Sequence, residues 1–203
     1  MDRSVLIAIP AFNEENTILS VLKSVKNYGY PIVFNNNSTD NTKKISILNN
    51  NEVIDVDSQG YENVIFAICK FFKNSNYKKL VIIDGDGEVG LDSMDEMIGA
   101  LDSKDIVTGK RDKIYRPSEK FICSIFKIFH GIDDVFCGFK GFKHSGISDD
   151  FKKDTFSTSV FNKNANKTSI PVKVFQREGD SKLGSGIRLE LSLLSGGLRG
   201  FFS

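Results

Sequence analysis

The chain has 203 residues, of which 40% are hydrophobic and 26% are charged, a mixture typical of a globular domain. Its formal net charge of +1 gives no basic excess, so we expect no nucleic-acid partner. Three distant cysteines argue against a disulfide framework or a zinc site, and no apolar run reaches the roughly 20 residues that span a bilayer. Because the chain starts directly with a strand-like run, we expect a cytoplasmic protein without a signal peptide.

Short apolar runs alternate with helical patterns along the first half of the chain. The predicted strands are 4–9, 31–34, 53–56, 80–83 and 105–108. Between them, apolar residues repeat at helical spacing, and Asn13 is the predicted N-cap of the first helix. Later in the chain we expect a helix over 119–130 and strands near 137–142 and 170–175. This order predicts an α/β fold, a doubly wound, mostly parallel sheet flanked by helices, in a single domain over 1–203.

Polar clusters follow the first, second, fourth and fifth predicted strands, and ligands bind at that edge of such sheets. Asp84 and Asp86 flank Gly85 directly after a buried strand, and Glu88 adds a third carboxylate. Such oxygen ligands suit Mg²⁺ or Mn²⁺. The alternative is a solvated acidic turn. An EF-hand is disfavoured, because the sixth loop position is Val89 where that motif requires glycine.

Two other loops at this edge have the residues to bind a nucleoside. In residues 10–15 a base could stack near Phe12, and Glu14 could accept from a base or ribose; the alternative is a plain helix start. Residues 35–40 could hydrogen-bond a base edge, or they could form a turn in which Ser38 or Thr39 caps a helix.

Taken together, the loops resemble those of family 2 glycosyltransferases with the GT-A fold. Residues 7–15 (IAIPAFNEE) resemble the family's opening, and residues 35–42 (NNNSTDNT) look like its DDGSTDNT loop. Gly60-Tyr61, DGDG at 84–87 and DIVTGKR at 105–111 follow in the family order. DVFCGFK at 134–140 and REGDSK at 177–182 resemble the branch of dolichol-phosphate mannosyltransferase and related polyprenyl-phosphate sugar transferases.

The resemblance implies a metal-dependent, inverting transferase whose donor is a nucleotide-diphosphate sugar. Residues 1–110 would form the nucleotide-sugar-binding half and residues 111–203 the acceptor-side half. Asp86, with Glu88, would hold Mg²⁺ or Mn²⁺ on the diphosphate, where charge develops as the glycosidic bond breaks. The residues lining the nucleotide would be Pro10, Phe12, Glu14, Phe34, Asn36, Asp84 and Gly85. The residues facing the phosphates or the acceptor would be Arg111, Arg177 and Lys182.

The chain departs from the family pattern at Asn35 and Asn36, where the family has paired aspartates. An asparagine keeps an acceptor oxygen but carries no charge, so the identity of the base stays open. A polyprenyl phosphate acceptor needs no strong base, whereas a sugar hydroxyl does. Asp134 is the candidate base, with Asp133 second, and the equal alternative is that Asp134 orients Arg111.

An apolar stripe at helical spacing lies within 121–129, with Lys120 and Lys127 nearby. It fits a helix facing the core, or a helix in a membrane interface where a lipid-linked acceptor enters. We therefore expect a lipid-linked acceptor, with peripheral contact at the inner face of the membrane. The alternatives are a transferase that extends a cell-surface glycan and a non-catalytic nucleotide-sugar-binding relative. A nucleotidyltransferase is disfavoured, because the first loop has no Gly, Arg or Lys.

Overall fold

A computed structural model describes residues 4–114, 116–153 and 158–175. Seven strands form one sheet in the order β3-β2-β1-β4-β6-β5-β7. The strands are β1 (Val5–Ala11), β2 (Tyr30–Asn35), β3 (Glu52–Asp55), β4 (Lys79–Ile82), β5 (Ile106–Arg111), β6 (Lys140–Phe142) and β7 (Lys167–Val172). The helices are α1 (Ile18–Val25), α2 (Thr42–Leu48), α3 (Tyr61–Lys73), α4 (Met94–Ala100) and α5 (Pro117–His130), with 3-10 turns at Leu91–Ser93, His144–Gly146 and Thr158–Val160.

The sheet is mostly parallel, as the alternation of strands and helices predicts. The pairs β1–β2, β1–β4, β2–β3 and β5–β7 are parallel. Strand β6 is antiparallel to both of its neighbours, β4 and β5. Because β6 comes from the second half of the chain and lies between two strands of the first half, the two halves expected from the sequence share one sheet.

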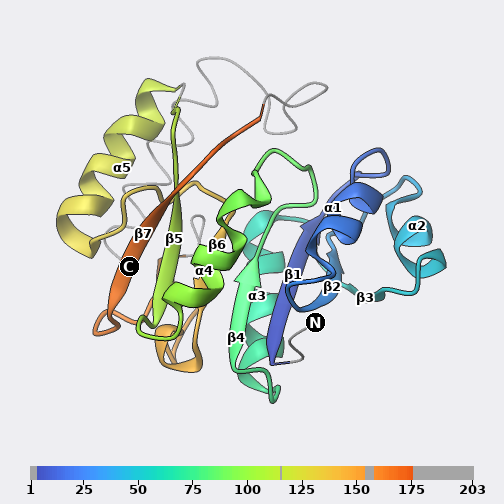
Figure 1. Cartoon of the computed structure of the whole chain (residues 1–203), viewed down its shortest axis with the longest axis horizontal. Helices are drawn as coiled ribbons and strands as arrows, with labels where there is room; N and C mark the ends of the chain where they lie inside the picture. Colours follow the sequence, from blue (N-terminus) through green and yellow to red (C-terminus); the bar gives the residue numbers. More distant parts are fainter. Residues whose placement is uncertain (1–3, 115, 154–157, 176–203) are drawn as a thin grey trace.

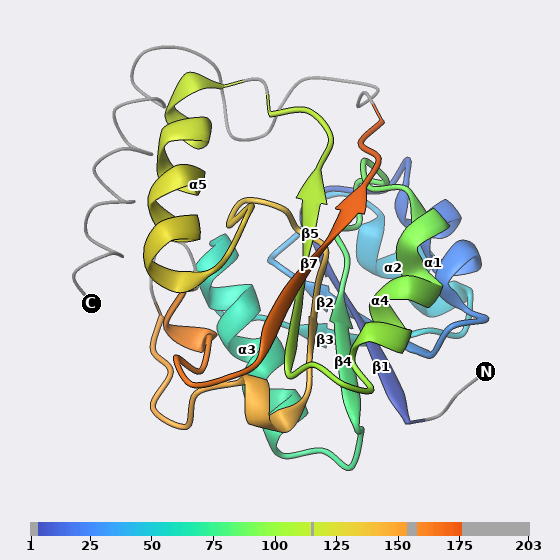
Figure 2. The same ribbon diagram turned by 60° about the vertical axis from the view of Figure 1, so that its left-hand side comes forward.

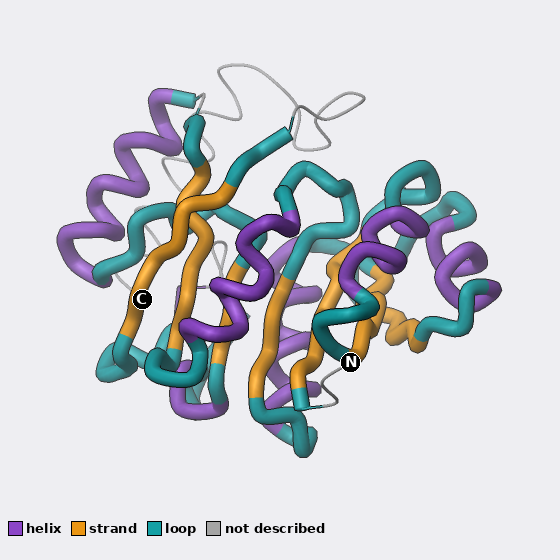
Figure 3. Tube along the Cα trace, viewed as in Figure 1, coloured by secondary structure: helices purple, strands orange, loops and turns teal. Residues whose placement is uncertain are grey.

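Helices cover both faces of the sheet, so the domain has three layers (Figures 1, 2 and 3). Alternate residues of β1 divide between the two faces: Leu6 and Ala8 pack with α3, whereas Val5, Ile7 and Ile9 pack with α1 and α4. Both faces of the central strand are therefore buried, which explains its continuous apolar sequence.

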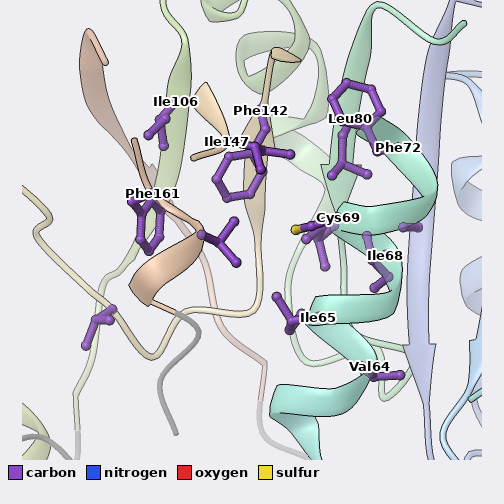
Figure 4. Close-up of a cluster of buried hydrophobic side chains, with 14 of the residues drawn as sticks. Val64, Ile65, Ile68, Cys69, Phe72, Leu80, Ile106, Phe142, Ile147 and Phe161 are labelled. Carbon is purple, nitrogen blue, oxygen red and sulfur yellow. The ribbon is translucent and has the colours of Figure 1, made fainter. Parts of the chain in front are cut away.

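The larger core cluster lies between the sheet and the helices α3 and α5. Figure 4 shows one row of α3 side chains directed at the strands, with Cys69 and Phe72 close to Leu80 of β4 and Phe142 of β6. The row consists of Val64, Ile65, Ile68, Cys69 and Phe72, at the spacing of a single helix face. This packing fixes the N-terminal end of α3 beside the carboxyl ends of the strands.

Two sequence-based boundaries differ from the structure. Asn13 does not cap α1, so that prediction is wrong: the helix begins at Ile18, and the Asn13 side chain accepts a hydrogen bond from the backbone N–H of Thr39 at 2.8 Å. Asn13 has a φ of 55°, a left-handed conformation that asparagine tolerates better than most residues. The last strand is Lys167–Val172, three residues earlier than expected.

Helix α5 divides the predicted apolar stripe between core and surface. Ile122 and Phe126 are 3% and 1% exposed and pack into the core. Phe121, Ile128 and Phe129 are 57%, 76% and 65% exposed on the other side of the helix. The helix therefore has a core-facing side and an exposed apolar side. Among the described residues, no helix has the length and apolar character needed to cross a membrane.

Candidate active site

The loops after β1 and β2 are tied together by hydrogen bonds at the carboxyl edge of the sheet. The backbone N–H of Glu14 donates to the hydroxyl of Thr42 at 2.7 Å, and that of Glu15 donates to the carboxylate of Asp40 at 3.0 Å. The N–H of Asn36 donates to the carbonyl of Ala11 at 2.8 Å. Side chains thus satisfy N–H groups just before α1, and the first loop, with Glu14, is held in a fixed conformation.

The asparagines of the second loop have defined partners. The amide of Asn35 donates to Asp55 at 2.8 Å, and Asp55 forms an ion pair with Lys43 at 2.5 Å. An aspartate at position 35 would place a second carboxylate against Asp55, so the asparagine fits this environment better. The side-chain oxygen of Asn36 accepts from the N–H of Gly60 at 3.0 Å and so links the second loop to the start of α3.

Phe34 does not line the candidate site, contrary to the expectation from the resemblance. Its side chain has no exposed surface, and its ring packs edge-on against Phe71 of α3 with the centroids 5.9 Å apart. Strand alternation explains the placement, because Ile32 and Phe34 point to the same face of the sheet and both join the α3 core.

Asp84 and Gly85 follow β4 and lie against the first loop. The N–H of Gly85 donates to the carbonyl of Pro10 at 3.1 Å, and the hydroxyl of Thr17 donates to the carbonyl of Gly85 at 2.8 Å. A Cβ on Gly85 would come within 3.2 Å of the Pro10 carbonyl oxygen. Position 85 therefore favours glycine, and the buried Pro10 contributes its backbone to the site.

The carboxylate of Asp84 rests on the backbone of Gly138. A Cβ added to Gly138 would fall 1.8 Å from Oδ2 of Asp84, closer than two unbonded atoms can approach. Burial raises the pKa of Asp84 to about 7, and the negative charges of Asp86, Glu88 and Glu14 act in the same direction. The site is therefore a partly buried region crowded with carboxylates.

Asp86 begins a tight turn that is attached to the segment after β7. Its carboxylate accepts from the N–H of Glu88 at 3.0 Å, and Gly87 takes a φ of 74°. The carbonyl of Glu88 accepts from the N–H of Phe175 at 2.8 Å, and the N–H of Gly90 donates to the carbonyl of Lys173 at 3.0 Å. The conformation of this turn thus depends on residues far along the chain.

The donor set of this turn fits a magnesium or manganese ion. These ions are usually bound through one or two carboxylates together with substrate phosphates and water. Asp84 and Asp86 supply such carboxylates, and the crowding that raises the pKa of Asp84 is what a cation would relieve. Within the described ranges no three His, Cys, Asp or Glu side chains converge as a metal site, so Glu88 does not complete a three-carboxylate cluster.

An ionic network lies at the carboxyl end of β5. Arg111 donates through Nε to Oδ2 of Asp134 at 2.7 Å and through Nη2 to Oδ1 at 3.0 Å. Nη2 also reaches Glu119 at 2.9 Å, and Arg116 donates to the other oxygen of Glu119 at 3.1 Å. Burial opposes the charge of Arg111, but Asp134 and Glu119 outweigh it and raise the pKa of Arg111 above its ordinary value.

This network changes the expected role of Asp134. The side chain of Asp134 has no exposed surface, and both of its oxygens accept from Arg111. It also accepts from the N–H of Phe136 at 3.2 Å. The geometry matches the alternative weighed from the sequence, in which Asp134 orients Arg111, and a buried carboxylate in this position is unsuited to act as a general base. Asp133 forms an ion pair with Lys127 at 2.9 Å.

The structure thus brings Pro10, Glu14, Asn36, Asp84, Gly85 and Asp86 to the same edge of the sheet. Phe12, the expected stacking partner of a base, is half-buried in the first loop. Arg177 and Lys182, expected to face phosphates, lie outside the described residues.

Sequence reasoning did not assign Tyr61 or Lys140 to the site. Tyr61 is 37% exposed as a residue, but desolvation of its hydroxyl raises the pKa well above its ordinary value, and Asp84 is the largest of the charges that add to this effect. Lys140 is 6% exposed on β6, and its charge opposes the rise in the pKa of Asp84. Two sequence signals could have identified them: Gly60-Tyr61 at the start of a helix, and the lysine that follows Gly138-Phe139.

Comparisons with known proteins agree with this geometry. The sequence model of glycosyl transferase family 2 matches residues 6–123, more than half of the chain. An uncharacterised glycosyltransferase of Mycobacterium tuberculosis is 27% identical over 109 residues, which cover 53% of this chain and 49% of that protein. The match thus spans about half the length of that relative. An uncharacterised protein of Methanocaldococcus jannaschii is 30% identical over 165 residues, covering 70% of this chain and 72% of that protein.

Solved structures share the fold. Glucosyl-3-phosphoglycerate synthase from Mycobacterium tuberculosis, in complex with Mn²⁺, UDP-glucose and glycerol 3-phosphate, has a TM-score of 0.72 at 15% identity. The similarity covers 98% of this chain and 80% of the synthase. The same enzyme with Mn²⁺, UDP and glucosyl-3-phosphoglycerate gives a TM-score of 0.71. The family match includes all three loops described above, and it shows that this chain belongs to glycosyl transferase family 2.

Proposed function

We propose that this chain transfers a sugar, with inversion, from a nucleotide-diphosphate sugar to a lipid-linked phosphate such as a polyprenyl phosphate. The observation that carries the donor half of the proposal is the meeting of three loops at one edge of the sheet. The Asp84-Gly85-Asp86 turn, the loop containing Glu14 and the loop containing Asn36 lie together there. The structural relative that binds Mn²⁺ and UDP-glucose supports the same arrangement.

Each loop has a distinct part in binding the donor. The first loop, with Phe12 and Glu14, and the side chain of Asn36 would hold the base and ribose. Asp86, with Asp84 beside it, would hold Mg²⁺ or Mn²⁺ against the diphosphate. The bound cation would supply the positive charge that stabilises the leaving diphosphate. The glycine at position 85 lets the turn after β4 lie directly against the first loop, because a Cβ there would come within 3.2 Å of the Pro10 carbonyl oxygen.

The acceptor half of the proposal rests on helix α5 and the residues before it. The side chains of Arg111 and Arg116 are 19% and 28% exposed, and their guanidinium groups are bridged by Glu119. Within the described part of the chain, Nη1 of Arg111 and Nη2 of Arg116 have no hydrogen-bond partner. Paired arginines with unused donors match the oxygens of a phosphate group.

The same helix also has an exposed apolar side, opposite the side on which Glu119 binds the arginines. Phe121 and Ile128 of α5 are 57% and 76% exposed, and the exposed Lys120 adjoins Phe121 in the sequence. A lipid phosphate has an anionic head and an apolar tail, which correspond to the arginine pair and to this side of α5. The helix would then lie at the membrane interface without crossing the bilayer.

A phosphate acceptor also agrees with the state of Asp134. A phosphate oxygen is already anionic near neutral pH and attacks the anomeric carbon without losing a proton, whereas a sugar hydroxyl needs a base within hydrogen-bond reach. Asp134 is buried and bound to Arg111, so it is not available as that base. Arg111, held in place by Asp134 and Glu119, would orient the acceptor phosphate for an in-line attack opposite the leaving diphosphate.

The proposal is tested by a transfer assay. The chain is incubated with UDP-, GDP- or dTDP-sugars and Mn²⁺, with either a polyprenyl phosphate in detergent or a water-soluble sugar as acceptor. We expect transfer to the lipid phosphate from one donor class and loss of at least about tenfold in Asp86→Asn. The control Asp92→Asn alters an exposed aspartate whose ion-pair partner among the described residues is Lys173, at 3.7 Å, and should keep full activity. Efficient transfer to the soluble sugar alone would replace the lipid acceptor with a glycan.

A further inference from the structure

Lys140 is a buried lysine with few partners. It is 6% exposed and occupies β6, opposite Ile82 of β4 and Thr108 of β5. Its ammonium donates one hydrogen bond, to the carbonyl oxygen of Cys137 at 2.5 Å. An ammonium has three N–H donors, and the described residues give this one no second acceptor and no ion pair.

The position of Lys140 in the sheet places it under Asp84. Phe139, the residue before β6, packs with α1 and α4, whereas Phe142, the last residue of β6, packs with α3. Because side chains alternate along a strand, Lys140 points to the same face as Phe142, toward α3. Ile82 faces the same way, and Asp84, two residues beyond it, lies near enough to Lys140 for each charge to act on the other. Gly138, two residues before Lys140, is the residue whose missing side chain accommodates the Asp84 carboxylate.

Among the described residues, the acidic side chains whose charges act on Asp84 are Asp86, Glu88 and Glu14, and the basic one is Lys140. Burial lowers the pKa of Lys140 itself, an effect that outweighs the neighbouring negative charges. The folded protein therefore keeps this ammonium at a net cost in stability. Local features that lower stability often occur at functional sites.

We propose that Lys140 is a positioning residue of the active site, the internal counterion that keeps the Asp84 carboxylate seated on Gly138. The inference rests on the proposed function, because Asp84 adjoins the turn that would bind the donor. Through the Cys137 carbonyl, the same ammonium fixes the turn that begins at Asp134, where the N–H of Cys137 donates to the Asp134 carbonyl at 3.4 Å. One side chain thus links the donor-side carboxylate to the aspartate that orients Arg111.

The test replaces the charge and keeps the length of the side chain. In Lys140→Met we expect kcat to fall by about tenfold or more, with a smaller change in KM for the donor. The unfolding temperature should change little, because the burial cost of the ammonium is removed together with its attraction to Asp84. The matched control is Lys167→Met: Lys167 is the first residue of the edge strand β7, opposite Ile106, burial also lowers its pKa, and it too donates to a carbonyl, that of Lys163 at 3.1 Å. Its kcat should be unchanged.

Two further variants keep the proposal falsifiable if Lys140→Met does not fold. Lys140→Gln can still donate to the Cys137 carbonyl but has no charge, and Lys140→Arg keeps the charge. Higher kcat in the arginine variant than in the glutamine variant supports the proposal, whereas equal kcat overturns it. Wild-type kcat in Lys140→Met, or activity lost only in proportion to the folded fraction, also overturns it.

A structural readout separates this inference from the proposed function. If the wild-type protein transfers no sugar from any donor, the proposed function has failed. A crystal structure of Lys140→Met decides the role of Lys140 independently of activity. Asp84 displaced from Gly138 supports the role, and Asp84 in its original place refutes it.

Discussion

Substituting Gly138 by alanine tests whether the seat of Asp84 matters for activity. The added Cβ would lie 1.8 Å from Oδ2 of Asp84. Ordinary van der Waals contacts of a Cβ begin at 3.4 Å, so the carboxylate must retreat by about 1.6 Å. Asp84 is the far end of a side chain that can rotate, so the cost in folding free energy should be modest, about 1–2 kcal/mol. A displacement of about 1 Å at a reacting centre costs on the order of 100-fold in rate, so kcat should fall by about that factor.

The assay measures kcat with saturating donor and Mn²⁺, beside the free energy of unfolding from urea titration. The matched control is Gly99→Ala in α4, where an added Cβ would meet no atom within 4 Å. That variant should keep full activity and gain about 0.5–1 kcal/mol, because alanine favours a helix over glycine. Normal turnover in Gly138→Ala would show that the position of Asp84 is not critical, and the proposed site would have to be revised.

Three further predictions concern other parts of the molecule. Asn35→Asp should lower the free energy of unfolding by about 1–3 kcal/mol in urea titration, because it replaces the donor to Asp55 with a second carboxylate. Hydrogen bonds from Lys43 and Asn35 hold the pKa of Asp55 below 3.8. The stability that Asp55 contributes is therefore present above pH 3.8 and is lost as the pH falls through its lower pKa in the folded protein. Asp55→Asn should reduce this loss of stability in acid, as measured by thermal melts at pH 2 to 5. Replacing Phe121 and Ile128 together by aspartate should abolish sedimentation with anionic vesicles at low salt, whereas the control Ile47→Asp, at a residue 51% exposed on α2, should leave it unchanged. Failure of the wild-type protein to sediment would argue against the membrane contact.

The sequence predicts the sheet well because its strands are short apolar runs between helical patterns, and these depend on local periodicity. The direction of β6 was not predictable in the same way. It has three residues, Lys140–Phe142, and it pairs with strands that lie more than 50 and about 30 positions earlier. The type and position of Asn13 predict an N-cap of the first helix, but its side chain accepts a hydrogen bond from Thr39 in another loop. Such a contact between distant segments cannot be read from a local sequence pattern.

The site was predictable where function depends on residues close together in sequence, as in the turn of Asp84 and Asp86. It was not predictable where the contact joins distant segments. The pairing of Asp84 with Gly138, and that of Arg111 with Asp134, depend on the register of β6 and on the turn before it. Phe34 is the opposite case: the resemblance implies that it lines the nucleotide, whereas the alternation of Ile32 and Phe34 along β2 places both in the core.

The insertion of β6 between β4 and β5 has a consequence for how the chain folds. The ribosome synthesises β4 and β5 before residues 140–142, which form β6. Until β6 is made, the hydrogen-bonding edges of β4 and β5 that will face it have no partner strand. Pairings across such sequence separations form late, because the entropy of closing a long loop must be overcome first. Unpaired edges of apolar strands promote aggregation while they remain exposed. Nascent chains stalled between residues 111 and 140 should therefore be the species most dependent on chaperones.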